Sequence, residues 1–334
     1  MAENPVVPEL PPRLILDLAT RCNLRCGMCP VWGSDDEAAI DSIKGVMALE
    51  NARKVLDEAM AAKPLVHPIL YGEPLLAPAF KEVVVDVKAR GLTIAINTNG
   101  LALTEEMARF LVDVGVDSVS VSIDAVTPET LKLIRGITDL DRIEAAVHRL
   151  LAVRGSGTTP RIGVSYTTQE DNQHEEAAFV ARWIPLVDVV RIGHVFRDGA
   201  FQGFETPKVR VPCNALYLTM PVHHDGTVTV CCLDSFRETN MGNVFESSVA
   251  EVWQGEAFQQ ARYWHETGQY DKIPVCDKCN GWVQYMFEEE VRDGLLIRRS
   301  PEFIYYNRID RMENWSGQLL GGHLDHQAGN VGEK

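Results

Sequence analysis

Three cysteines stand close together near the start of the chain. Cys22, Cys26 and Cys29 lie in the segment TRCNLRCGMCPVWG, residues 20–33. Thiolates are soft ligands that suit zinc or iron–sulfur clusters. A closed zinc site needs four ligands, whereas each iron of a cubane cluster needs one ligand from outside. The CxxxCxxC spacing therefore favours a [4Fe–4S] cluster in which one iron is left for a substrate or a cofactor.

Five further cysteines occupy the C-terminal part of the chain. Cys276 and Cys279 form a CxxC pair, and Cys213 precedes a predicted hairpin that ends at Cys231 and Cys232. Clustered cysteines in a protein of a reducing compartment indicate metal binding or catalysis rather than disulfides. These residues supply a second four-thiolate site with one thiol left over, and a zinc ribbon is the alternative to a cluster there.

The elements around the first cysteine group follow a regular alternation. Apolar runs of strand length alternate with segments of helical periodicity, which predicts six β/α units with a parallel sheet covered by helices. No GxGxxG follows the first strand, so a dinucleotide-binding fold is disfavoured. The Cys22 loop directly follows that strand, where chemistry is expected. We expect strands over 13–20, 67–72, 92–97, 118–124, 161–168 and 188–195, and helices over 47–62, 78–90, 104–114, 128–135, 139–154 and 173–184.

Composition restricts the partners of the protein. The 334 residues include 47 acidic and 32 basic side chains, a formal net charge of −15, which argues against a nucleic-acid partner. No apolar run is long enough to span a bilayer, and MAENPVVPELPP lacks the features of a signal peptide. We therefore expect a cytoplasmic protein that binds neither nucleic acid nor a membrane.

The motif CNLRCGMC, from Cys22 to Cys29, resembles the signature of the radical S-adenosylmethionine (SAM) superfamily. The resemblance implies an α/β fold, a partial (β/α)6 TIM-type barrel over 13–200, and SAM bound to the fourth iron of the cluster. One electron from the cluster then cleaves SAM, and the resulting 5′-deoxyadenosyl radical abstracts a hydrogen atom. The electron implies an external reductant of the flavodoxin or ferredoxin type.

Further motifs at the ends of the predicted strands resemble SAM-binding segments of that family. YGEP (71–74) resembles the family's GGEP, with a tyrosine in place of the first glycine, while NTNG, SID and RIGH end the third, fourth and sixth strands. The resemblance implies that the GEP segment holds the methionyl amino group and that Arg135 of LIRG pairs with the methionyl carboxylate. The SAM contacts implied in this way are Gly72, Glu73, Asn97, Ser122, Asp124, Arg135, Gly193 and His194.

The segment that begins HHDGTVTVCC and ends VCDKC resembles the SPASM/twitch extension of radical SAM enzymes. Its cysteine count fits the shorter twitch form, a small domain of a β-hairpin and a helix with one auxiliary cluster. The resemblance implies a second [4Fe–4S] cluster on Cys213, Cys231, Cys276 and Cys279. We place this domain at 201–290, expect a disordered lead-in over 1–12, and expect a C-terminal helical tail over 291–334 with a disordered end.

Cys232 is the cysteine that neither cluster uses. In twitch epimerases a cysteine donates a hydrogen atom to the substrate radical, so the resemblance implies that Cys232 is a catalytic donor, and packing is the alternative. The first strand begins at residue 13, which leaves no room ahead of it for a peptide-recognition domain. We therefore expect epimerisation of a carbohydrate-type natural product, an aminoglycoside, oligosaccharide or sugar nucleoside. The alternatives are dehydrogenation of a carbinol to a ketone through the auxiliary cluster, decarboxylation of a uronate sugar nucleoside, peptide or protein maturation, and a non-catalytic iron–sulfur or zinc protein.

Overall fold

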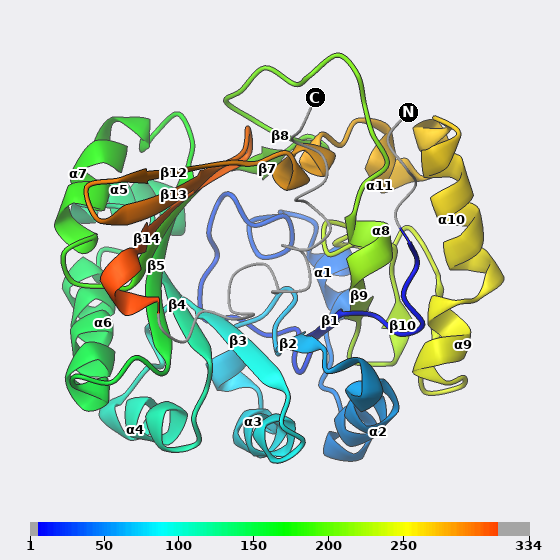
Figure 1. The fold of residues 1–334 in the computed structure, drawn as a ribbon, viewed down its shortest axis with the longest axis horizontal. Helices are drawn as coiled ribbons and strands as arrows, with labels where there is room; N and C mark the ends of the chain where they lie inside the picture. Colours follow the sequence, from blue (N-terminus) through cyan, green and yellow to red (C-terminus); the bar gives the residue numbers. More distant parts are fainter. Residues whose placement is uncertain (1–5, 313–334) are drawn as a thin grey trace.

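The computed structural model describes residues 6–312, and within them a parallel sheet forms the wall of a partial barrel (Figure 1). Neighbouring strands follow one another in chain order from β1 to β6, each parallel to the next. This arrangement confirms the predicted barrel. Its strands are β1 (Arg13–Leu16), β2 (Leu65–His67), β3 (Thr93–Thr98), β4 (Ser118–Ser122), β5 (Arg161–Thr168) and β6 (Val189–His194).

Helices cover the outer, convex side of this wall, as Figure 1 shows. Leu14 and Leu16 of β1 are fully buried in the same core cluster as Val55 of the first outer helix. Because side chains alternate across a strand, Arg13 and Ile15 lie on the opposite, concave face. The outer helices are α2 (Leu49–Ala59), α3 (Phe80–Ala89), α4 (Glu105–Asp113), α5 (Pro128–Arg135), α6 (Leu140–Arg154) and α7 (Glu176–Trp183).

Segments from the last third of the chain extend the sheet at both of its edges. On one side β9 (Thr219–Val222) lies parallel to β1 and is followed outward by β10 (Thr227–Val228) and β11 (Gly242–Asn243). On the other side β14 (Phe303–Arg308) runs antiparallel to β6. Beyond it come β13 (Leu295–Arg299) and β12 (Glu288–Arg292), so that twelve strands of the described residues form one sheet.

The predicted C-terminal helical tail is wrong for residues 291–308. The edge of β6 carries backbone groups that need partners, and β14 supplies them, with Tyr305 opposite Arg191. The rest of that prediction, 313–334, lies outside the described residues. The second strand was also misplaced, because β2 ends at His67, directly before Pro68, and the segment 68–72 is a loop.

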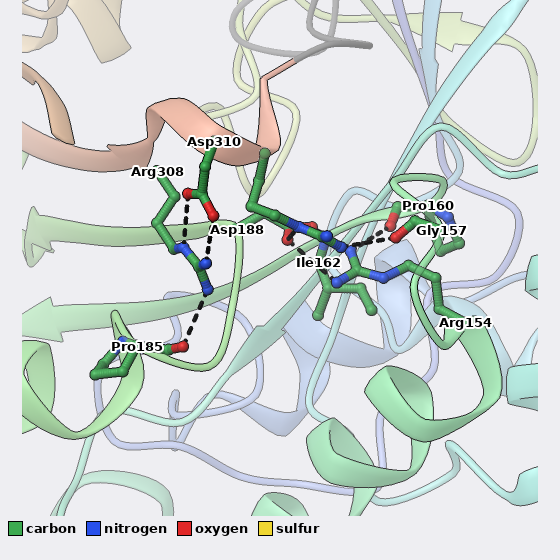
Figure 2. A network of polar contacts seen from close by, with 9 residues as sticks. Arg154, Gly157, Pro160, Ile162, Pro185, Asp188, Arg308 and Asp310 are labelled. Atoms are coloured by element: carbon green, nitrogen blue, oxygen red, sulfur yellow. Dashed lines mark hydrogen bonds and ion pairs between the residues drawn. The ribbon is translucent and has the colours of Figure 1, made fainter. Parts of the chain in front are cut away.

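The buried carboxylate of Asp188 helps to fasten the C-terminal hairpin of β13 and β14 to the barrel (Figure 2). Asp188, just before β6, is 1 % exposed, forms an ion pair with Arg154 and accepts the backbone N–H of Ile162 at 2.7 Å. Arg311, which follows β14, bonds to the other carboxylate oxygen of Asp188 at 3.1 Å. Arg308 donates to the carbonyl of Pro185 at 3.0 Å. The end of the hairpin is thus held by the same carboxylate that joins β5 to β6.

The prediction of a disordered lead-in is wrong for Pro8, whose carbonyl accepts hydrogen bonds from Trp253 Nε1 at 2.9 Å and Gln254 Nε2 at 2.8 Å. Residues 1–5 lie outside the described range.

The remaining helices are α1 (Glu37–Ile43), α8 (Ala215–Leu218), α9 (Val249–Trp253), α10 (Glu256–Glu266) and α11 (Pro274–Asp277), and β7 (Phe196–Arg197) pairs with β8 (Ala200–Phe201). Short 3₁₀ helices lie at Met60–Ala62, Pro74–Leu76, Gln173–Glu175, Tyr270–Lys272, Gly281–Tyr285 and Ile309–Arg311.

Candidate active site

The loop after β1 folds tightly around its three cysteines. The backbone N–H of Cys29 donates to the carbonyl of Cys26 at 2.9 Å, and that of Gly33 donates to Cys29 at 3.0 Å. A Cβ at Gly33 would lie 2.4 Å from the Cys26 carbonyl oxygen, so only glycine fits there. Cys26 is buried, and Cys22 and Cys29 are half-buried. The three thiols therefore come from one compact loop.

Electrostatics around these thiols suit a positively charged group. Burial raises the pKa of Cys26 to about 11, an effect that Arg135 partly offsets, and burial also raises the pKa of Cys22. A buried cysteine that keeps its proton in the absence of a metal becomes a thiolate when a metal centre stabilises the negative charge. The donor set and its surroundings therefore fit an iron–sulfur cluster.

The GEP segment holds the cysteine loop in place. A Cβ at Gly72 would lie 2.1 Å from the carbonyl oxygen of Ala19 and 2.9 Å from that of Arg21. The next backbone N–H, that of Glu73, donates to the Arg21 carbonyl at 2.7 Å. The predicted SAM-binding segment thus also supports the residue directly before Cys22.

Gly72→Ala is expected to displace the cysteine loop, because the new methyl group meets backbone rather than a movable side chain. We expect a cost of about 1–3 kcal/mol in stability and a lower iron content after anaerobic reconstitution. Gly27→Ala, in the same loop, is the matched control, since a Cβ there has nothing within 4 Å. Equal iron content in both variants would show that the contact at Gly72 does not position the ligands.

Glu73 links the loops that follow β2 and β3. It is 2 % exposed and accepts hydrogen bonds from Thr98 Oγ1 at 2.6 Å and the backbone N–H of Asn99 at 2.7 Å. Burial raises its pKa, and these hydrogen bonds oppose the rise. Asn99 Nδ2 donates to Asn23 Oδ1 at 2.7 Å and lies 3.9 Å from Cys22 Sγ. Asn99 belongs to the NTNG motif, in which the predicted SAM contact is Asn97; Asn97 is exposed on the concave face of β3.

Two of the predicted SAM contacts, Asp124 and Arg135, form an ion pair with each other. Arg135 Nε lies 2.8 Å from Asp124 Oδ2, and both side chains are buried. Asp124 has a left-handed backbone, φ +66°, and its other carboxylate oxygen accepts the backbone N–H of Thr167 at 2.7 Å. Among the described residues, Asp124 is the hydrogen-bond partner of Arg135. The guanidinium held in this way lowers the pKa of the Cys26 thiol, against the larger rise caused by burial.

The remaining predicted SAM contacts lie at the ends of β4 and β6. Ser122 accepts a hydrogen bond from Ser165 at 3.1 Å. Gly193 leaves room for Arg191, whose Nη1 lies 2.5 Å from the place a Cβ would take. His194 packs against Phe204, with 5.5 Å between ring centroids, and burial lowers its pKa. His194 is therefore covered by the segment that follows the barrel.

The four cysteines expected to bind the auxiliary cluster line one common cavity, and Cys232 is not among its lining residues. Burial raises the pKa of Cys213 and Cys276 to about 12. Backbone N–H groups point at two of the sulfurs: Leu233 N lies 3.5 Å from Cys231 Sγ and Gly281 N lies 3.3 Å from Cys279 Sγ. Hydrogen bonds to sulfur are one means by which proteins tune iron–sulfur clusters.

In the described part of the chain no three His, Cys, Asp or Glu side chains converge closely enough to hold a single metal ion. In a cubane each thiolate binds a different iron, so the sulfurs are spread over a larger volume. The cavity lined by four thiols fits that arrangement.

Tyr71 connects the two cysteine regions. Its hydroxyl donates to the carbonyl of Cys232, and its own carbonyl accepts the indole N–H of Trp32. The backbone N–H of Trp32 in turn lies 3.3 Å from Cys29 Sγ. The residue that stands where the family motif has a glycine therefore contacts both the first cysteine loop and the peptide of Cys232. No local pattern in the sequence indicates this contact, because it depends on how the two loops meet.

Comparison with known proteins gives matches over both regions. Residues 17–177 match the family model of the radical SAM superfamily, and residues 213–280 match that of the iron-sulfur cluster-binding domain SPASM. The chain is 28 % identical over 326 residues to the tungsten-containing aldehyde ferredoxin oxidoreductase cofactor-modifying protein of Pyrococcus furiosus, covering 80 % of this chain and 86 % of that protein. Other curated relatives, probable GTP 3′,8-cyclases among them, are matched over 46 % of their length or less.

Solved structures show the same fold. BtrN in complex with AdoMet and 2-DOIA aligns with a TM-score of 0.53 at 16 % identity, over 83 % of this chain and 94 % of that chain. Streptococcus suis SuiB bound to precursor peptide SuiA aligns with a TM-score of 0.61 at 15 % identity, over 82 % and 72 %. At such identities the likeness concerns the fold. No helix in the described range has the length and apolar character needed to cross a bilayer.

Proposed function

Because this chain belongs to the radical SAM superfamily and carries a SPASM-type iron–sulfur domain, we propose that it epimerises a carbon atom of a carbohydrate-type small molecule, with Cys232 as hydrogen donor. We assign the SAM-cleaving cluster to Cys22, Cys26 and Cys29. The auxiliary cluster is assigned to Cys213, Cys231, Cys276 and Cys279. When bound, the first cluster and SAM supply a 5′-deoxyadenosyl radical that abstracts a hydrogen atom.

The residues of this chain position that chemistry and shield it from water. Gly72 and Glu73 support the loop that carries the first three thiols. The Asp124–Arg135 ion pair fixes a positive charge close to Cys26. Asn97, Ser122 and Gly193 lie on the concave face of the sheet, at or near the ends of their strands, where we assign them to SAM together with His194.

One observation carries the assignment of Cys232: the other four late cysteines line a common cavity and Cys232 does not. Its carbonyl is held by Tyr71, beside the first cysteine loop. In one turnover the substrate carbon loses one hydrogen atom and receives one from the Cys232 thiol on the opposite face. The sulfur radical left behind regains its hydrogen as one electron from the external reductant, of the flavodoxin or ferredoxin type, and one proton from water.

Epimerisation in deuterium oxide tests this proposal, because the thiol exchanges its hydrogen with solvent. The wild-type enzyme, given candidate sugars, is expected to place deuterium at the inverted carbon. Cys232→Ser keeps the size and polarity of the side chain, but a hydroxyl does not give up a hydrogen atom to a carbon radical. This variant is expected to lose deuterium incorporation while it continues to release 5′-deoxyadenosine.

Three results would contradict the proposal and name its replacement. Full epimerisation by the Cys232→Ser variant would remove the donor assignment. One ketone formed per SAM consumed would identify dehydrogenation through the auxiliary cluster. Release of carbon dioxide from a uronate substrate would identify a decarboxylase.

The similarity to the Pyrococcus furiosus protein favours a second candidate. That relative is named as a cofactor-modifying protein and is matched over most of its length. A small organic metal cofactor in place of a sugar would use the same radical chemistry. Incubation with the cofactor extracted from a tungsten enzyme, followed by mass analysis of that cofactor, tests this candidate against the sugar substrates. Because the SuiB structure holds a bound precursor peptide, peptides are the third class of substrate to screen.

A further inference from the structure

The concave face of the barrel carries arginines although the chain as a whole is strongly acidic. Val190 and Ile192 of β6 belong to the outer core cluster, so Arg191 between them lies on the concave face, as Arg13 does on β1. Arg191 is satisfied there: its Nε donates to the hydroxyl of Tyr305 at 3.1 Å, and its Nη2 lies 3.1 Å from Glu302 Oε1.

Arg13 differs from Arg191 because it has no such partner. Within the described residues it makes neither a hydrogen bond nor an ion pair through its side chain, and its Nε is buried without a partner. A buried guanidinium nitrogen that is left unpaired costs free energy, so native structures provide a partner for it. The partner that a guanidinium fork matches best is a carboxylate or a phosphate.

The surroundings of Arg13 lie between the barrel and the auxiliary region. His67, which is opposite Ile15 on the neighbouring strand, has its pKa lowered to about 3 by burial and then by Arg13. The charge of Arg13 also opposes the rise that burial causes in the pKa of Tyr285, which ends the 3₁₀ helix that follows Cys279. A group bound to Arg13 therefore lies beside β9, because Arg13 is opposite Thr219 of that strand.

The middle of the concave face is lined by small side chains. Asn97, Ser120 and Gly163 stand directly opposite one another on β3, β4 and β5, and Ser122 stands opposite Ser165. These residues fill little of the concave side and offer hydroxyl and amide groups, whereas the outward positions carry larger apolar side chains. A polar substrate that is anchored at one end suits this surface.

We propose that Arg13 binds an anionic group of the substrate, a carboxylate or a phosphate, and so places the rest of the substrate across the concave face. This assignment rests on the proposed function and narrows its substrate to an anion. An acidic protein with a cationic patch inside its barrel selects for such a molecule by electrostatic focusing.

Anion binding to the reconstituted protein tests the proposal. Inorganic phosphate and malonate are titrated separately by calorimetry with SAM present at saturation, so that the SAM site is filled and the anions do not bind there. The wild type is expected to bind at least one of the two anions at a single site. The anion that binds more tightly indicates whether the substrate carries a phosphate or a carboxylate. Arg13→Gln is expected to weaken that binding about tenfold or more, and Arg13→Lys, a point charge without the fork, to weaken it less.

Arg53→Gln is the matched control, because Arg53 lies on the outer helix α2 and pairs with Asp86 in solvent. It is expected to bind the anion as the wild type does, and melting temperatures of all variants establish that they are folded. Equal binding by the Arg13→Gln variant, or no saturable binding of either anion by the wild type, overturns the proposal. Anion binding that occurs only when SAM is left out of the titration would assign Arg13 to SAM instead of the substrate.

SAM cleavage and anion binding at Arg13 are tested separately. Release of 5′-deoxyadenosine by the wild type under reductant, without added substrate, tests SAM cleavage alone. Anion binding at Arg13 without SAM cleavage would overturn the proposed function, whereas SAM cleavage without anion binding would overturn the anionic substrate only.

Discussion

Cys26→Ala is expected to remove SAM cleavage altogether. Cys26 is the buried member of the first group, and its loss leaves two thiols for a cluster that needs at least three. We expect iron to fall from about eight to about four per chain, since each [4Fe–4S] cluster carries four. Release of 5′-deoxyadenosine should fall by much more than the roughly 10–100-fold typical of losing a supporting contact around a metal site.

Two comparisons make this result specific. Cys232→Ala should retain about eight irons, because neither proposed cluster uses that thiol. Cys279→Ala should also lose about four irons, but these come from the auxiliary cluster. The first cluster should remain, so the spectrum of the protein should still change when SAM is added. A Cys26→Ala protein that still held the full complement of iron would show that the three-cysteine loop is not the ligand set.

Arg135→Leu is expected to cause the largest loss of stability among the variants considered. The substitution leaves the carboxylate of Asp124, which is fully buried, without its countercharge. Breaking a buried ion pair in this way costs about 3–5 kcal/mol. The midpoint of unfolding in urea, measured anaerobically, should fall accordingly.

The double variant Asp124→Leu/Arg135→Leu checks the cause of that loss. If the unpaired carboxylate is responsible, the double variant should be less destabilised than the sum of the two single variants. Arg53→Leu removes an exposed ion pair and should change stability by no more than about 1 kcal/mol. Strict additivity would mean that Arg135 stabilises the protein through packing rather than through its charge.

The sequence predicted the parts of the fold that local patterns specify. The fifth strand was expected over 161–168 and β5 occupies those residues, because its apolar run is long and bounded by turn residues. The second strand was misplaced because Pro68, which has no N–H to donate, ends the pairing that the apolar run suggests should continue. The strand β14 was missed because its partner, β6, is more than a hundred residues away.

The candidate site likewise has parts that the sequence predicted and parts that it did not. The spacing of the cysteines was visible in the sequence, and both groups are brought together by the fold. The supporting contacts were not visible. Gly72 is required by the carbonyl of Ala19, Asn99 contacts Cys22, and Arg13 faces the concave side at the start of a strand. Each of these depends on how separate loops approach one another, which no local pattern specifies.

The placement of β9 and β14 has a consequence for the newly made chain. The strands β1 and β6 leave the ribosome early, but their outer neighbours come from residues 219–222 and 303–308. Until then each presents a row of unpaired backbone groups of the kind that promotes aggregation. The loop with Cys22 is attached to one of these unfinished edges. Delivery of iron and sulfide to the first site should therefore be most productive after synthesis of the whole described chain is complete.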